Sequence, residues 1–134
     1  MRLHTYLGFN GDCRQAFAFY AEQLGGQVFA MQTYGETPGC HGLQPDVAPL
    51  IMHARLEVGP YTIMGTDATP DHPYTGITGS YLVADVDSAQ KAEALFAAFA
   101  EGGAVEMPLQ ETFWARRYGI LTDRHGVRWM INCT

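Results

Sequence analysis

The chain has 134 residues, of which 47% are hydrophobic and 16% are charged, and its net charge is −6 at neutral pH. This composition predicts one globular domain with a sizeable core and argues against disorder. Only 8 residues are lysine or arginine, so we expect no nucleic-acid partner, and the acidic balance also disfavours an anionic membrane surface.

The first half of the chain reads as a strand, a helix and three further strands. Residues 2–9 predict a strand, and Asn10–Asp12 supply turn and N-cap residues for a helix over 12–24. Cys13, Phe17, Tyr20 and Leu24 fall on one face of that helix, which Gly25 and Gly26 end. Strands are expected over 27–34, 50–58 and 61–66, with a long loop rich in glycine and proline over 35–49.

The second half repeats this order. A strand is expected over 78–86, followed by a helix over 89–103 with Asp87 and Ser88 as cap candidates. The pattern then predicts a short strand at AVEMPL (104–109), a longer one at FWARRYGILTD (113–123) and a last one at GVRWMINC (126–133). Both predicted helices end in Gly-Gly, so we interpret the chain as an internal repeat of two β-α-β-β-β modules, residues 1–67 and 78–134, within one domain.

The cysteines and the absence of long apolar runs indicate in which cellular compartment the protein is expected. Cys13, Cys40 and Cys133 are odd in number and form no C-x-x-C motif. No stretch approaches the roughly 20 apolar residues of a membrane span, and MRLHTYLGF lacks the apolar run of a signal peptide. We therefore expect a cytoplasmic protein with reduced thiols and no membrane partner.

Two segments carry a resemblance to a known family. They are YLGFNGDCRQAFAFYAEQLGG (6–26) and QETFWARRYGILTDRHGVRWMIN (110–132). With the paired modules, they make the chain resemble the vicinal oxygen chelate superfamily of glyoxalases, bleomycin-resistance proteins and extradiol dioxygenases, and within it the PhnB-like branch. The resemblance implies an α+β fold in which two modules form a curved mixed sheet around a pocket, and it implies a homodimer.

The resemblance also implies where a metal would bind. Metal-dependent members take four ligands from the first and last strands of each module, and matching those strands to this chain gives His4, Met64, Ser80 and Met130. Thioethers and a neutral hydroxyl are poor ligands for the divalent ions of this superfamily. We therefore expect no metal cofactor, and we expect His4 to line a metal-free pocket or to be an ordinary core histidine.

The segment QETFWARRYG (110–119) has the densest mixture of aromatic and polar side chains. If it is a strand, Trp114, Arg116 and Tyr118 share one face. Such a face is typical of a pocket wall for a small molecule, although Trp, Tyr and Arg are also favoured at dimer interfaces. Glu111 and His4 are weak candidates for acid–base catalysis.

Three functions follow from these patterns. The first is metal-independent binding of a small molecule by His4, Met64, Ser80, Trp114, Tyr118 and Met130. The second is a lyase, isomerase or dioxygenase that uses a metal held by other ligands or acid–base chemistry from His4 and Glu111. The third is a protein-interaction module with a vestigial pocket.

Overall fold

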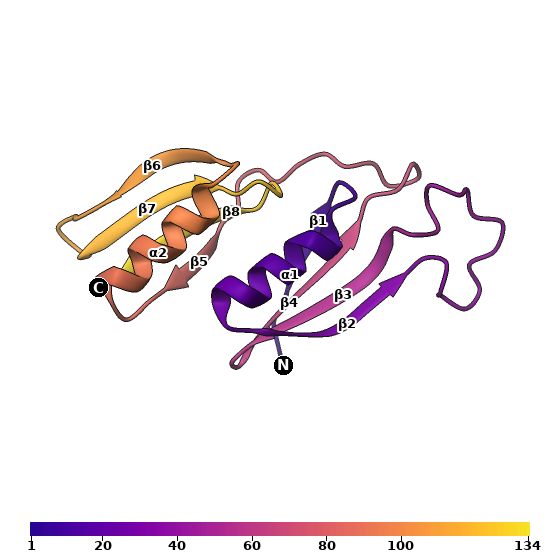
Figure 1. The fold of residues 1–134 in the computed structure, drawn as a ribbon, viewed down its shortest axis with the longest axis horizontal. Helices are drawn as coiled ribbons and strands as arrows, with labels where there is room; N and C mark the ends of the chain where they lie inside the picture. Colours follow the sequence, from indigo (N-terminus) through magenta and orange to yellow (C-terminus); the bar gives the residue numbers. More distant parts are fainter. The chain divides into compact units, whose positions relative to one another are not determined.

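The computed structural model describes residues 1–134, which divide into two compact units, Met1–Gly76 and Ile77–Thr134 (Figure 1). The first unit contains β1 (Thr5–Phe9), α1 (Cys13–Leu24), β2 (Gln27–Thr33), β3 (Ile51–Val58) and β4 (Tyr61–Asp67). The second contains β5 (Leu82–Asp85), α2 (Ala89–Ala100), β6 (Ala104–Gln110), β7 (Arg117–Thr122) and β8 (Arg128–Cys133). The predicted β-α-β-β-β order is thus confirmed in both halves.

Each unit has one mixed sheet of four strands, and neither sheet closes on itself. The strand orders are β1-β4-β3-β2 and β5-β8-β7-β6. In each sheet the first strand runs parallel to the last one along the chain, and the other pairings are antiparallel. The two units therefore have the same topology, which confirms the α+β class and the repeat expected from the sequence.

The core of the first unit forms between α1 and the sheet. The spacing of Cys13, Phe17 and Tyr20 places them on one helix face, and all three are fully buried. Phe17 and Tyr20 pack with Phe9 of β1, whose ring lies edge-on to Phe17 with centroids 5.8 Å apart. Gly25 then ends α1 in the left-handed conformation with φ of 70°, as the sequence predicts.

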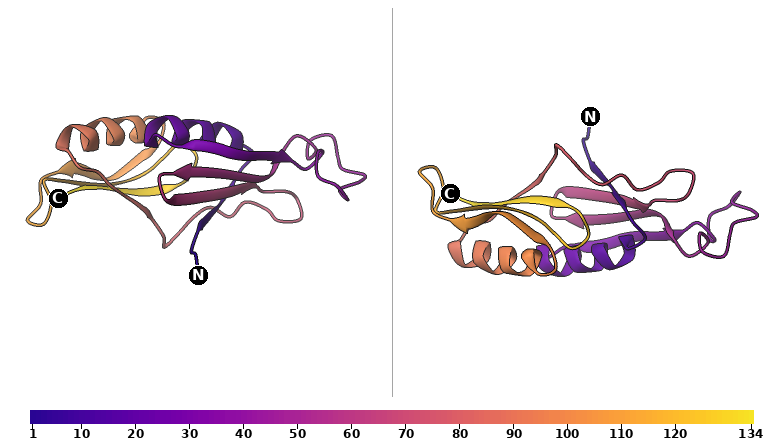
Figure 2. Two further views of the ribbon diagram at one scale, coloured as in Figure 1. Left: turned by 90° about the horizontal axis from the view of Figure 1, so that it is seen from below. Right: turned by 90° about the horizontal axis from the view of Figure 1, so that it is seen from above.

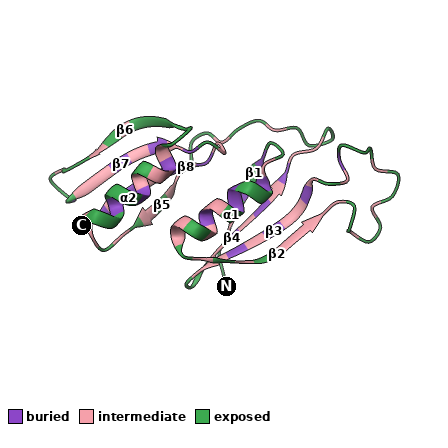
Figure 3. Cartoon of the chain, in the orientation of Figure 1, coloured by how far each residue is buried: buried purple, intermediate pink, exposed green.

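The second unit follows the same plan with its own residues. Ser88 caps α2, its hydroxyl accepting a hydrogen bond from Lys91 N at 3.1 Å. The fully buried Phe99 of α2 packs on Trp129 of β8, with ring centroids 4.8 Å apart. Figure 3 shows the buried positions gathered on the helices and strands of each unit.

Several expected boundaries are wrong. β1 and β5 are shorter than predicted because each is an edge strand whose pairing covers only Thr5–Phe9 and Leu82–Asp85. α2 ends at Ala100, before the Gly-Gly pair. The predicted strand over 113–123 starts only at Arg117, because Thr112 and Ala115 close a turn: Thr112 N donates to Ala115 O at 3.0 Å, and Ala115 N to Thr112 Oγ1 at 3.1 Å.

The cap predicted for α1 also differs in the structure. The Asp12 side chain makes no cap bond to the helix, and Cys13 N instead donates to Asp67 Oδ1 at 2.9 Å. Neither helix of the structure combines the length and the apolar character needed to cross a membrane.

Candidate functional site

Each sheet has one face covered by the helix of its own unit and an opposite face, which we call the distal face (Figure 2). Glycines fix which residues belong to it. A Cβ on Gly65 would lie 2.8 Å from the Phe17 ring of α1, and one on Gly119 would lie 2.7 Å from the Phe96 ring of α2. Since side chains alternate along a strand, Met64 of β4 and Tyr118 of β7 lie on the distal faces.

The distal face of the second unit carries an aromatic strip made of Trp114, Tyr118 and Met130. The Trp114 and Tyr118 rings lie edge-on with centroids 5.3 Å apart, and the Tyr118 hydroxyl donates to Met130 Sδ at 3.3 Å. Trp114 is 49% exposed, whereas Tyr118 and Met130 are half-buried. Phe113 packs edge-on against Trp114 and is fully exposed.

The strip comes from two neighbouring strands and one turn. Tyr118 pairs with Asn132, and Ile120 pairs with Met130. Side chains at paired positions point to the same face of the sheet, so Tyr118 and Met130 share one face. Trp114 reaches Tyr118 from the turn over 112–115 and not from a strand. The predicted shared face of Trp114 and Arg116 is therefore wrong, although the expected proximity of Trp114, Tyr118 and Met130 is found.

Asn132 contributes a polar group beside the strip. Its Nδ2 donates to Asp85 Oδ1 of β5 at 2.7 Å, which orients the amide. Its Oδ1 is buried and has no hydrogen-bond partner. The distal face of this unit thus carries an apolar surface with a buried, unpartnered acceptor beside it.

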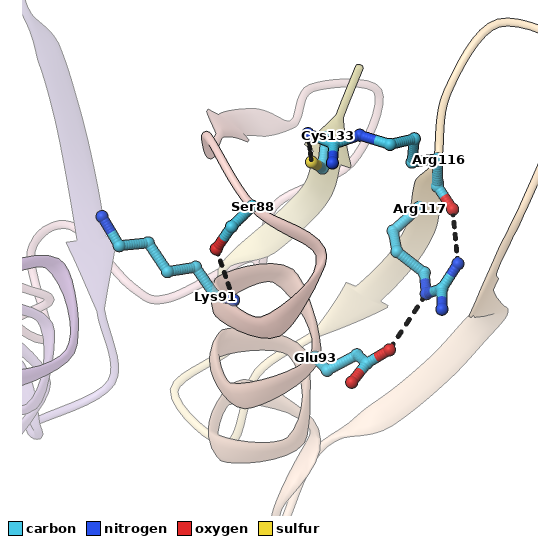
Figure 4. Close-up of polar contacts among 6 residues, drawn as sticks. All are labelled: Ser88, Lys91, Glu93, Arg116, Arg117 and Cys133. Atoms are coloured by element: carbon cyan, nitrogen blue, oxygen red, sulfur yellow. Dashed lines mark hydrogen bonds and ion pairs between the residues drawn. The ribbon is translucent and has the colours of Figure 1, made fainter.

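The two arginines that precede Tyr118 serve the fold (Figure 4). Arg116 Nε donates to Thr134 O at 2.8 Å and its Nη2 to Cys133 Sγ at 3.2 Å. Arg117 Nε donates to Glu93 Oε1 of α2 at 3.1 Å. Both guanidinium groups are therefore engaged at the C-terminal end and the helix, away from the aromatic strip.

A second polar cluster on the same sheet was not singled out from the sequence. Arg128 lies over the Tyr81 ring, 4.1 Å from its centroid, and hydrogen-bonds the Tyr81 hydroxyl. It also pairs with Glu106 Oε1 at 3.2 Å. The alternation of RWMINC, which places Arg128 on the same face as Met130 and Asn132, is the signal that could have found it.

The distal face of the first unit is more polar. Tyr6 of β1 pairs with Met64, and Met64 pairs with Arg55 of β3. The Arg55 guanidinium forms an ion pair with Glu57 through Nη2 and Oε1 at 2.7 Å. The Tyr6 hydroxyl lies 3.4 Å from His53 Nδ1.

The remaining predicted residues lie outside the strands. His4 directly precedes β1, Ser80 lies two residues before β5, and Glu111 follows β6, and all three are exposed. The structure therefore brings together the three site residues of the aromatic strip, while Met64 belongs to the other unit.

Asp67 is a buried structural carboxylate. Besides Cys13 N, it accepts a hydrogen bond from Ile51 N at 2.9 Å, and it is 2% exposed. Burial raises the pKa of the neighbouring Cys13 thiol, and the negative charges of Asp67 and Asp12 raise it further. A thiol in this state is a poor nucleophile, so Cys13 is a core residue.

Comparison with known proteins shows to which family the chain belongs. The model of the Glyoxalase/Bleomycin resistance protein/Dioxygenase superfamily matches residues 2–131. The chain belongs to this superfamily. The resemblance expected from the sequence is thus confirmed, and the two β-α-β-β-β units are the modules of this fold.

Several known proteins are similar over nearly the whole chain. Protein YjdN of Escherichia coli K12 is 38% identical, over 98% of this chain and 95% of its own. The crystal structure of PA1353 from Pseudomonas aeruginosa has a TM-score of 0.91 at 48% identity, covering 99% of this chain and 97% of its own. The PhnB protein from Bacillus cereus, at a TM-score of 0.85 and 21% identity over the full length of both chains, shares the fold.

The four positions that correspond to the metal ligands of metal-dependent members are His4, Met64, Ser80 and Met130, and His4 is the one imidazole among them. Met64 and Met130 offer thioethers, and the Met130 sulfur already accepts a hydrogen bond from Tyr118. Ser80 offers a neutral hydroxyl. Nickel, zinc, iron and manganese prefer imidazole, carboxylate or thiolate, and one imidazole with two thioethers and a hydroxyl does not fit such an ion.

Proposed function

We propose that this superfamily member binds a small molecule with a planar apolar group, without a metal ion. The observation that supports the proposal is the aromatic strip of Trp114, Tyr118 and Met130 on the distal face of the second unit. An indole that is 49% exposed is held in place by the Tyr118 ring beside it.

The chemistry of the strip favours a flat ligand. Burying apolar surface contributes about 25 cal/mol per Å², and ring pairs in offset or edge-on geometry add about 0.5–1.5 kcal/mol. The thioether of Met130 is polarizable and flexible, so it adapts to the outline of a ring. Asn132 Oδ1 is buried and has no partner, so a ligand N–H or O–H group that displaces the side chains over it would gain an acceptor there.

The test is a titration of the purified protein with a panel of planar aromatic compounds, followed by tryptophan fluorescence and by the melting temperature. Trp129 is buried and bonded to Asp123, so it provides a constant background, and Trp114 provides the signal. We expect a saturable fluorescence change together with a rise in melting temperature, since a ligand at 100 times its Kd stabilises the native state by about 2.7 kcal/mol.

The matched control is Trp114→Phe, which keeps an aromatic ring but removes the fluorescent reporter. The variant should retain the thermal shift while losing most of the fluorescence change. A chemically diverse panel that leaves both signals of the native protein unmoved would contradict the proposal.

A further inference from the structure

Arg55 occupies the middle of the first unit's sheet. Its neighbours along β3, Ala54 and Leu56, are fully buried on the side of α1, so Arg55 lies on the distal face. Across the strands it pairs with Met64 of β4 and Ala30 of β2. Neither of these side chains offers an oxygen acceptor to the guanidinium.

The guanidinium is only partly satisfied. Nη2 donates to Glu57 Oε1 at 2.7 Å, whereas Nε is buried and has no hydrogen-bond partner. A buried N–H without an acceptor is unfavourable, and more so on a charged group. The side chains of the Arg55–Glu57 pair are 41% and 34% exposed, so the pair itself is weakly held and can rearrange.

The same face carries a hydroxyl group on β1, two strands away from Arg55. Burial, with a smaller effect of Tyr34, raises the pKa of Tyr6, so its hydroxyl keeps its proton at neutral pH. Tyr6 pairs with Met64, which in turn pairs with Arg55, and the Tyr6 hydroxyl lies 3.4 Å from His53 Nδ1. Glu57 supplies the opposing negative charge on the face.

We propose that Arg55 is an anion-binding residue that takes the carboxylate of a small organic acid at its free Nε–H. Arginine presents Nε–H and an Nη–H as a planar fork that matches the two oxygens of a carboxylate. Because Nε is buried, the partly exposed Arg55–Glu57 pair rearranges on binding and uncovers it. The ligand oxygen then supplies the acceptor that Nε lacks, and Glu57 either shares Nη2 or gives it up. The proposal concerns the first unit alone and does not depend on the aromatic strip.

The experiment follows the Arg55 Nε–H signal in ¹H–¹⁵N NMR spectra of the full chain, assigned by its absence from Arg55→Lys. Acetate is titrated as the smallest carboxylate, with acetamide as its neutral counterpart, and sodium chloride keeps the ionic strength constant. We expect acetate to move the Arg55 Nε–H signal saturably and acetamide to leave it in place. Arg14, an exposed arginine of α1, serves as the internal reference.

Variants test the assignment through the backbone amide signals of β3 and β4, which report binding in every protein. Arg55→Gln should weaken acetate binding about tenfold or more, because a hydrogen bond to a charged group is lost. Arg55→Lys should also weaken it, because an ammonium lacks the fork. Glu57→Gln should bind acetate more tightly, because it removes the competing carboxylate.

Three results would overturn the proposal. They are an Arg55 Nε–H signal that acetate does not move, an equal response to acetamide, and an equal response at Arg14. Each is independent of the tryptophan titration, so failure of this site and failure of the aromatic strip are distinguishable.

Discussion

The carboxylate of Asp67 ties together three elements of the first unit. It stands at the end of β4, and its two oxygens accept hydrogen bonds from the first residue of α1, Cys13, and the first residue of β3, Ile51. This side chain therefore supplies an acceptor for an N–H at the start of the helix, which has no partner within the helix. The local sequence suggested Asp12 for that task, because a cap residue is sought beside its helix and not 54 residues away.

Asp67→Asn should destabilise the fold by about 1–3 kcal/mol. An amide has one oxygen, so one of the two backbone N–H groups would face an NH₂ group and lose its acceptor. Urea unfolding, with stability extrapolated to water, measures the change. Asp71→Asn, at an exposed position in the following loop, should stay within about 0.5 kcal/mol of the native protein. Equal losses in the two variants would contradict the role given to Asp67.

The elements themselves were largely predictable, and the misses have physical causes. Periodicity found both helices, because Cys13, Phe17 and Tyr20 recur at helical spacing and fill the core. Periodicity could not find the turn over 112–115, since it depends on two hydrogen bonds between Thr112 and Ala115 inside a run that reads as a strand.

The candidate site was predictable only in part. Six residues were expected to line one pocket. Three of them, Trp114, Tyr118 and Met130, lie together on the distal face of the second unit, and their role in binding stays a prediction. Arg55 was not singled out, because its free Nε–H depends on which neighbours β2 and β4 place beside it, and strand register cannot be read from composition.

Close packing of helix on sheet at Gly65 gives a prediction at the scale of the element. In Gly65→Ala the new Cβ would lie 2.8 Å from the Phe17 ring and 3.0 Å from the Phe9 ring, and both rings are fully buried. We expect a loss of about 1–3 kcal/mol, as for other overpacked cores. Urea and thermal unfolding both report it.

The matched control for Gly65→Ala is Gly8→Ala in the adjacent strand β1. A Cβ there would meet nothing within 4 Å, and Gly8 has no positive φ. This variant should be neutral or slightly more stable, because alanine restricts the unfolded chain. A Gly65→Ala protein as stable as Gly8→Ala would show that α1 moves away from β4 easily.

At the scale of the whole molecule, the chain uses one topology twice for different chemistry. The strand orders of the two units are identical, yet the first distal face carries Arg55, Glu57 and Tyr6 while the second carries the aromatic strip. A repeated fold determines the positions of the side chains on each sheet, but it does not determine which residue types occupy those positions. The function of this superfamily member therefore has to be argued from those side chains.

The donor set leads to a prediction about metals for the intact protein. Chelator-free, untagged protein incubated with nickel, zinc, iron(II), manganese or cobalt should retain each ion far below one equivalent. Met64, Ser80 and Met130 are poor ligands for these ions, and the single imidazole of His4 cannot hold one alone. Its melting temperature should not rise, since an ion that does not bind the native state cannot stabilise it. Elemental analysis and thermal melting measure the two effects, with His4→Ala as the matched variant. One equivalent of metal that raises the melting temperature of the native protein, and that His4→Ala loses, would make His4 a ligand and replace the metal-free proposal with a metal-dependent one.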